Sequence, residues 1–201
     1  MLLAWMLLLA LGRADPPDVT TPSPDGGWVI EAKWTGSRTG QAGYVWTLKN
    51  LKTSKVFFID KPRPDEVLPA RFRALWSPGS HYVALDLFYG RKVTGVTVVA
   101  IGPKPEIIDP LPNTLKPPLE QTLIKPEDLP AWDGSGLPIT GADAWLDDAT
   151  LSIDVTMDTA LQPKGGGRPT PLSVEWHKTV RFTGTTPKVI DSVCDSYDKG
   201  P

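Results

Sequence analysis

Hydrophobic and polar residues alternate with a period of two along much of the chain. From Trp28 to Thr35, apolar side chains occupy every second position, and Glu31, Lys33 and Thr35 lie on the other face. The same alternation returns at 44–49, 72–76 and 151–158. A period of two is typical of a β-strand that buries one face. We therefore expect antiparallel strands joined by turns rather than helices.

Two further segments are apolar on both faces. Tyr82 to Tyr89 is almost continuously hydrophobic, and Val96 to Ile101 is rich in β-branched residues. Such runs are typical of strands in the middle of a sheet with both faces covered. With a short strand at 56–59 and a turn at 77–80, the pattern predicts six strands between residues 26 and 101.

Composition supports the same fold class. The 201 residues include 22 Pro and 18 Gly, which disfavour long helices. We expect an all-β protein, an antiparallel meander or sandwich of blade-like sheets with a Pro-rich crossover and little helix. One Cys and two His are too few for a zinc site, an iron–sulfur cluster or a disulfide framework. We therefore expect no metal and no cofactor.

The pattern divides the chain into six segments, each with its own composition. Pro-rich stretches separate two strand-forming parts, and both ends lack regular alternation. In chain order we expect a signal peptide (1–14), an extended arm (15–25), an N-terminal antiparallel β part (26–101), a Pro-rich crossover (102–138), a C-terminal β part that packs on the first (139–190) and a loose tail (191–201).

The first residues indicate export. Residues 2–11 are all apolar, a run too short for the roughly 20 residues that span a bilayer. Gly12 and Ala14 place small residues before a cleavage site after Ala14. We expect a periplasmic or secreted product with no membrane span in the mature chain. The run lacks a preceding basic residue, so a buried N-terminal strand or helix is the alternative.

The whole chain has almost no net charge, but its two halves carry opposite net charges. The formal net charge is −2, which gives no global bias towards nucleic acid. Residues 26–101 carry a net charge of +6 and residues 102–201 a net charge of −6. Packing of the two halves on each other explains this division. The alternative is a basic docking surface for an anionic partner, with Arg71 and Arg73 as binding residues.

One segment resembles a single blade of a β-propeller of the TolB-like or WD40-like kind. The resemblance covers residues 71–101 and rests on Phe72, the Trp76-Ser77-Pro78 run, the Gly79-Ser80 turn and the Tyr82-Val83-Ala84-Leu85 strand. A fainter copy begins at Trp145, with Asp147-Asp148 as its turn. The resemblance implies blade-like antiparallel sheets. It does not imply a closed ring, which needs at least four blades of about 40 residues.

No catalytic constellation is evident. Ser80, His81 and Asp86 supply the residue types of a hydrolytic triad, but adjacent side chains diverge and no nucleophile elbow surrounds the serine. Asp147 and Asp148 form a carboxylate pair of the kind that solvated turns contain. We therefore predict no catalytic residues and favour a protein that is not an enzyme.

Tryptophan is abundant, with seven residues after the predicted cleavage site. Five of them lie on apolar strand faces and are expected in the core: Trp28, Trp34, Trp46, Trp76 and Trp176. Trp132 and Trp145 lie in or beside the Pro-rich segment and are the candidate binding residues. Exposed Trp side chains stack on sugars and hold Pro-rich or aromatic peptides.

These observations favour a non-catalytic binding or interaction protein of the cell envelope, with a protein or a glycan as partner. Three alternatives stay open. The protein is a carbohydrate- or peptide-binding module that uses exposed Trp, a hydrolase with a site assembled from sequence-distant residues, or a subunit or piece of a larger propeller-like assembly.

Overall fold

The computed structural model describes residues 16–36, 42–58, 69–88, 94–111, 138–161 and 170–199. In these ranges the chain forms twelve strands and no helix, and the strands make three antiparallel four-stranded sheets. The predicted all-β class is therefore confirmed. Within the same ranges, no helical segment has the length and hydropathy that crossing a membrane requires.

Each sheet is a meander of four strands consecutive in the chain. The first sheet contains β1 (Val19–Pro22), β2 (Trp28–Thr35), β3 (Gly43–Asn50) and β4 (Val56–Phe58). The middle sheet contains β5 (Arg71–Trp76), β6 (Tyr82–Phe88), β7 (Thr94–Ala100) and β8 (Glu106–Ile108). The last sheet contains β9 (Pro138–Asp147), β10 (Thr150–Leu161), β11 (Thr170–Thr183) and β12 (Thr186–Lys199).

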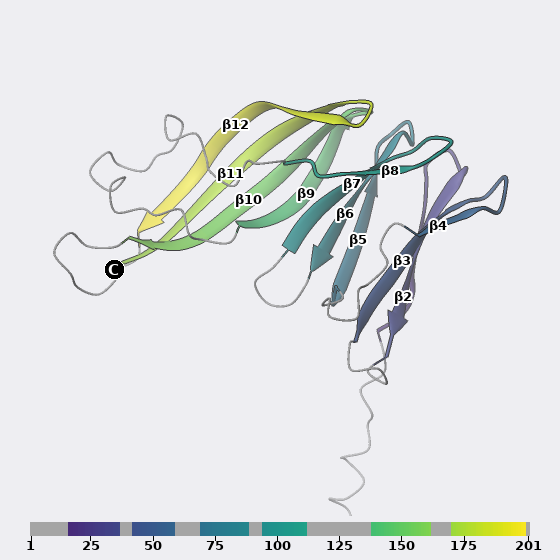
Figure 1. The fold of residues 1–201 in the computed structure, drawn as a ribbon. Helices are drawn as coiled ribbons and strands as arrows, with labels where there is room; N and C mark the ends of the chain where they lie inside the picture. The colour runs from purple at the N-terminus through teal and green to yellow at the C-terminus, as the bar shows by residue number, and fades with distance from the viewer. Residues whose placement is uncertain are drawn as a thin grey trace, which may run out of the picture.

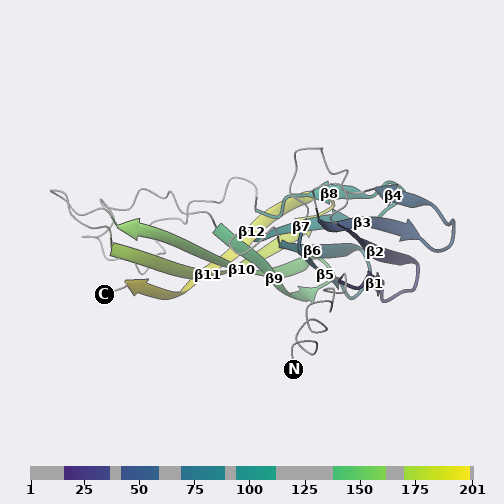
Figure 2. The ribbon, with the colours of Figure 1, turned by 90° about the horizontal axis from the view of Figure 1, so that it is seen from below.

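The three sheets follow one another in chain order, with the middle sheet between the other two (Figures 1 and 2). One apolar core joins the first and middle sheets and includes Ile30, Trp46 and Leu85. A second core joins the middle and last sheets and includes Val98 and Ile153. Strand β6 contributes to both cores, and six consecutive residues of it are buried.

The outer faces of the stack are polar. Glu31, Lys33 and Lys49 of the first sheet lie on positions that alternate with its buried residues. On the last sheet, Asp154 and His177 lie directly opposite each other on β10 and β11 and form an ion pair. Polar outer faces of this kind cap a stack of sheets against further stacking.

Three segments differ from the sequence-based expectation. Part of the predicted arm is strand β1, because extended Pro-containing backbone can pair at the edge of a sheet. The predicted crossover begins with β8, which pairs with β7. The chain from 191 to 199 is not a loose tail, because it forms the second half of β12. Register shifts along β11 and β12 break the alternation that would have revealed this strand.

The predicted signal peptide and most of the Pro-rich crossover, including Trp132, lie outside the described residues.

A buried carboxylate joins the middle sheet to the last. Asp86 on β6 is 1% exposed and accepts hydrogen bonds from Arg73 Nε at 2.7 Å and from the Ala142 N–H at 2.8 Å. The Arg73 guanidinium also donates to the Ala142 carbonyl. Asp86 is therefore satisfied by β5 and β9, as a buried charge requires. The pairing gives Arg73, a predicted binding residue whose side chain is 50% exposed, a structural role, whereas Arg71 on the same strand makes no ion pair with a described residue.

We predict that Arg73→Met lowers the free energy of unfolding by about 3 kcal/mol, because it leaves the buried Asp86 carboxylate without its cation. Chemical denaturation of both proteins measures the difference. Arg71→Met removes the same charge from the same strand and should change stability by about 0.5 kcal/mol or less. Equal effects of the two substitutions would contradict a specific role for the Arg73–Asp86 pair.

Lys178 lies on the inner face of the last sheet, in line with the buried residues Trp176 and Val180. It is 3% exposed and lies opposite Ile153 of β10 and Ser192 of β12. In the described part of the chain it makes no ion pair or hydrogen bond. Burial lowers the pKa of Lys178, because desolvation disfavours the ammonium form.

We predict that Lys178→Met raises the free energy of unfolding at pH 7 by about 1–2 kcal/mol, since the cation is no longer desolvated. Because the pKa of Lys178 is lowered in the folded state, the unfolded state binds more protons than the folded state at pH values between that pKa and 10.5. Stability should therefore rise with pH in this window, and the variant should lose that rise. Unfolding curves between pH 7 and 10.5 measure it, with the exposed Lys188→Met as the control. A pH dependence identical in native protein and Lys178→Met would refute the assignment.

Candidate functional site

Six turns gather at one end of the stack. In a four-stranded antiparallel meander, the first and third connections lie at the same end of the sheet. The three sheets therefore bring together the connections β1–β2, β3–β4, β5–β6, β7–β8, β9–β10 and β11–β12 (Figure 1). Two grooves open at this end and are lined by residues of these connections.

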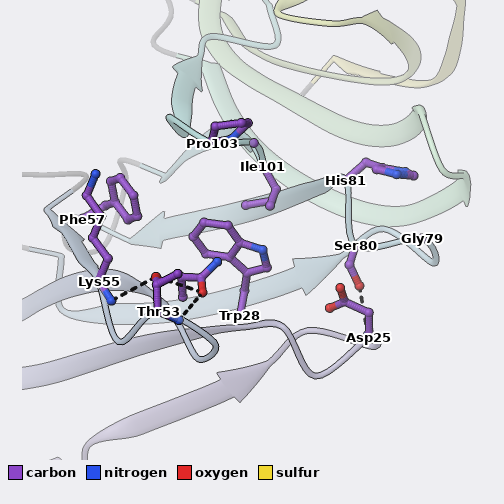
Figure 3. A pocket seen from close by; sticks show the side chains of 12 residues that line it. Asp25, Trp28, Thr53, Lys55, Phe57, Gly79, Ser80, His81, Ile101 and Pro103 are labelled. Carbon is purple, nitrogen blue, oxygen red and sulfur yellow. Dashed lines mark hydrogen bonds between the residues drawn. The ribbon is translucent and has the colours of Figure 1, made fainter.

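The first groove lies between the first and middle sheets and has a volume of about 480 Å³. Trp28, at the start of β2, lies in the middle of the groove (Figure 3). Its ring packs against Phe57 of β4 with a centroid distance of 5.9 Å. Ile101 and Pro103 of the β7–β8 connection form the opposite wall. The groove therefore has an aromatic side and an aliphatic side.

Charged groups lie at both ends of this groove. Lys55 places its ammonium 4.6 Å from the centroid of the Phe57 ring, a cation–π arrangement. Asp25 lies at the other end, beyond Trp28 (Figure 3). Hydrogen bonds from the Ser23 hydroxyl and the Gly27 N–H lower the pKa of Asp25 and favour its ionised form. The groove thus presents a cation and an anion on either side of an indole ring.

The β5–β6 turn connects the three sheets. Ser80 in this turn accepts a hydrogen bond from the Asp25 N–H at 3.1 Å, which ties the turn to the first sheet. On the other side, the Gly79 N–H donates to Asp148 of the last sheet. A Cβ at Gly79 would meet the Asp148 carboxylate, so a side chain there would displace Asp148 from this contact. The turn is therefore held from both sides.

Two serines beside the first groove have left-handed backbone conformations. In the described residues, Ser54 (φ 58°) and Ser80 (φ 63°) are the non-glycine residues with positive φ. Ser80 is buried, and its N–H donates to the Ser77 carbonyl at 2.9 Å. Such conformations cost of order 1 kcal/mol or more and persist where the surroundings determine them, often at binding sites. Two of the four turns that border the groove, β3–β4 and β5–β6, therefore contain one.

The second groove lies between the middle and last sheets and has a volume of about 430 Å³. His81 borders both grooves, and its Nδ1 lies 3.8 Å from Oδ2 of Asp148. Tyr82 closes one side, and its hydroxyl donates to the Gly184 carbonyl at 3.0 Å. Lys104 and Glu106 add charges of both signs to the lining.

The residue types of a hydrolytic triad do not meet here. The Ser80 side chain points to Asp25, whereas His81 points away from it (Figure 3). Asp86 is paired with Arg73. Asp147 caps its own turn, where hydrogen bonds from the Ala149 N–H and the Thr150 hydroxyl lower its pKa. Among the described residues, no three His, Cys, Asp or Glu side chains gather in a way that could hold a metal ion.

The tryptophans are distributed differently from the expectation. Trp145, a candidate binding residue, stacks on Tyr82 at 5.8 Å, and its indole N–H donates to the Leu75 carbonyl at 2.9 Å. Trp28, expected in the core, packs against the core between the first and middle sheets and also lines the first groove. Its position directly after the Asp25-Gly26-Gly27 turn was the available signal, because a side chain at the end of a strand lies where the sheets stop covering each other.

We predict that Ser80→Ala lowers the free energy of unfolding by about 1–2 kcal/mol, because the Asp25 N–H loses its acceptor while the left-handed conformation is retained. Ser80→Gly loses the same bond but adopts positive φ without strain, so it should cost about 1 kcal/mol less. Urea denaturation of the two variants checks the order. A glycine variant that is the less stable of the two would show that strain at Ser80 is negligible.

No family model matches the chain, and the comparison with curated proteins finds no significant match.

Proposed function

We propose that this protein is an exported, non-catalytic binding protein and that the first groove is its binding site. The observation that carries the proposal is the position of Trp28. Its indole ring lies in a groove between two sheets, and its N–H makes no hydrogen bond to any described residue. An accessible aromatic ring with an unused donor in a concave site is typical of ligand recognition.

The polar groups of the groove support binding rather than catalysis. The Ser80 hydroxyl accepts a hydrogen bond from the Asp25 N–H. Hydrogen bonds to the Asp25 carboxylate lower its pKa and favour its ionised form. Neither is arranged as a nucleophile beside a general base, which hydrolysis of an ester, amide or glycoside needs. Rigid turns that hold polar groups in fixed positions serve recognition, since they reduce the entropy lost on binding.

The hypothesis of a larger propeller-like assembly finds less support. The additional sheets of such an assembly would stack on the outer face of the first or the last sheet. These faces carry charged residues such as Lys33, Lys49 and Asp154. The exposed apolar residues of the last sheet, Leu146, Ile190 and Val193, come from its two edge strands rather than from one continuous patch.

We predict that Trp28→Phe weakens ligand binding about tenfold, because it removes part of the stacking surface and the indole donor. The purified protein is screened against arrays of glycans and of peptides, and the affinity of each bound compound is then measured for native and variant protein. Trp34→Phe is the matched control, since Trp34 lies on the same strand and face but packs against Tyr44 away from the groove. Native affinity in Trp28→Phe, or turnover of hydrolase substrates by the native protein, would contradict the proposal.

A further inference from the structure

The two grooves adjoin. His81, Ile101 and Gly102 line both of them, so the grooves meet over the β5–β6 turn and the start of the β7–β8 connection. Gly102 has no side chain there, and a Cβ added to it would meet no atom within 4 Å. We call these two adjoining grooves at the turn end of the three sheets the trough. An elongated ligand fits such a trough better than a compact one.

Charges of both signs line the trough. Asp25 and Lys55 belong to the first groove, and Lys104, Glu106 and Asp148 to the second. A neutral sugar polymer offers no opposite charges to these groups. A peptide offers side chains of either sign, and charge complementarity then sets its register. The trough therefore favours a peptide over a neutral glycan.

Three side chains of the first groove offer hydrogen-bond donors. Trp28 offers its indole N–H and Lys55 its ammonium group. The side-chain oxygen of Asn50 already accepts from the N–H groups of Lys52 and Thr53 and from the Thr53 hydroxyl, which leaves its amide N–H groups as donors. Asp25 supplies the carboxylate of the groove, and its first oxygen accepts from Ser23 and Gly27.

A donor-rich aromatic groove matches one backbone conformation particularly well. The polyproline II helix has no internal hydrogen bonds, so its carbonyl oxygens are all available as acceptors. Its proline rings pack on aromatic side chains, and it is extended before binding, which lowers the entropic cost. Trp28 and Phe57 supply the aromatic surface and the adjacent donors reach the carbonyls.

We propose that the trough binds an extended proline-rich peptide that carries a basic residue opposite Asp25. This inference rests on the proposed binding function of the first groove and extends it to the second. At about 3.1 Å per residue, six residues of polyproline II span about 19 Å and twelve span about 37 Å. A short peptide occupies one groove, whereas a longer one crosses Gly102 and engages both.

The test uses fluorescence anisotropy with labelled peptides of six and twelve prolines, a twelve-proline peptide with one central Arg, and a Gly–Ser peptide of twelve residues. The longer proline peptide should bind at least tenfold more tightly than the shorter one, and the Gly–Ser peptide should not bind. Adding Arg should tighten binding further in native protein but not in Asp25→Asn.

Gly102→Leu adds a side chain at a residue that lines both grooves, where its Cβ would meet no atom within 4 Å. It should remove the advantage of the twelve-residue peptide and leave the six-residue affinity unchanged. Gly95→Leu is the matched control, since its Cβ direction is equally open and Gly95 lines neither groove. Native affinity of Gly102→Leu for the long peptide would overturn the continuous trough.

The outcomes separate this inference from the proposed function. Glycans that bind with a loss in Trp28→Phe, together with no binding of proline peptides, would overturn the peptide ligand and keep the binding site. Proline peptides that bind equally well to native protein and Trp28→Phe would overturn both. Length-dependent, Trp28-dependent binding supports both.

Discussion

The whole structure depends on a middle sheet that is buried on both faces. Strand β6 buries six consecutive residues, so apolar side chains must cover it from two directions. The first and last sheets each supply one apolar face and keep the other polar. The single carboxylate among those six residues, Asp86, is tolerated because Arg73 and the backbone of β9 satisfy it. The middle sheet thus needs a sheet on each of its two faces.

The position of the grooves follows from this arrangement. Face-to-face meanders place six connections at one end, and the spaces between neighbouring sheets continue into the spaces between their turns. The β5–β6 turn and the β7–β8 connection belong to the middle sheet, so they can contact both neighbours. The bonds of the β5–β6 turn to Asp25 and Asp148 hold the two grooves at a fixed distance from each other. A turn held rigidly from both sides suits the recognition of a ligand that contacts all three sheets.

Local patterns predicted most of the strands but not the partners of their side chains. The alternation of β2 and β3 was visible because Ile30, Ala32 and Leu48 are buried on one face, and the central place of β7 followed from its two apolar faces. Strand β1 was missed because an edge strand with proline lacks alternation. The resemblance to a propeller blade stays a prediction, since a four-stranded meander is common to many β folds.

The candidate site was harder to predict, because its residues are meaningful only as a set. Asp25, Trp28, Lys55 and His81 come from three different turns and one strand end, and each alone is an ordinary residue of a hairpin. The sequence pointed instead to Trp145, whose neighbours are polar and Pro-rich, but tertiary packing gives that indole the Leu75 carbonyl and two aromatic rings. Trp28 combines an N–H that has no acceptor among the described residues with a ring that lines a groove, whereas the N–H groups of Trp46 and Trp176, which also lack an acceptor, are buried. A half-covered indole at the junction of two sheets is costly to expose without a ligand, and that asymmetry is the strongest physical reason to place recognition in the first groove.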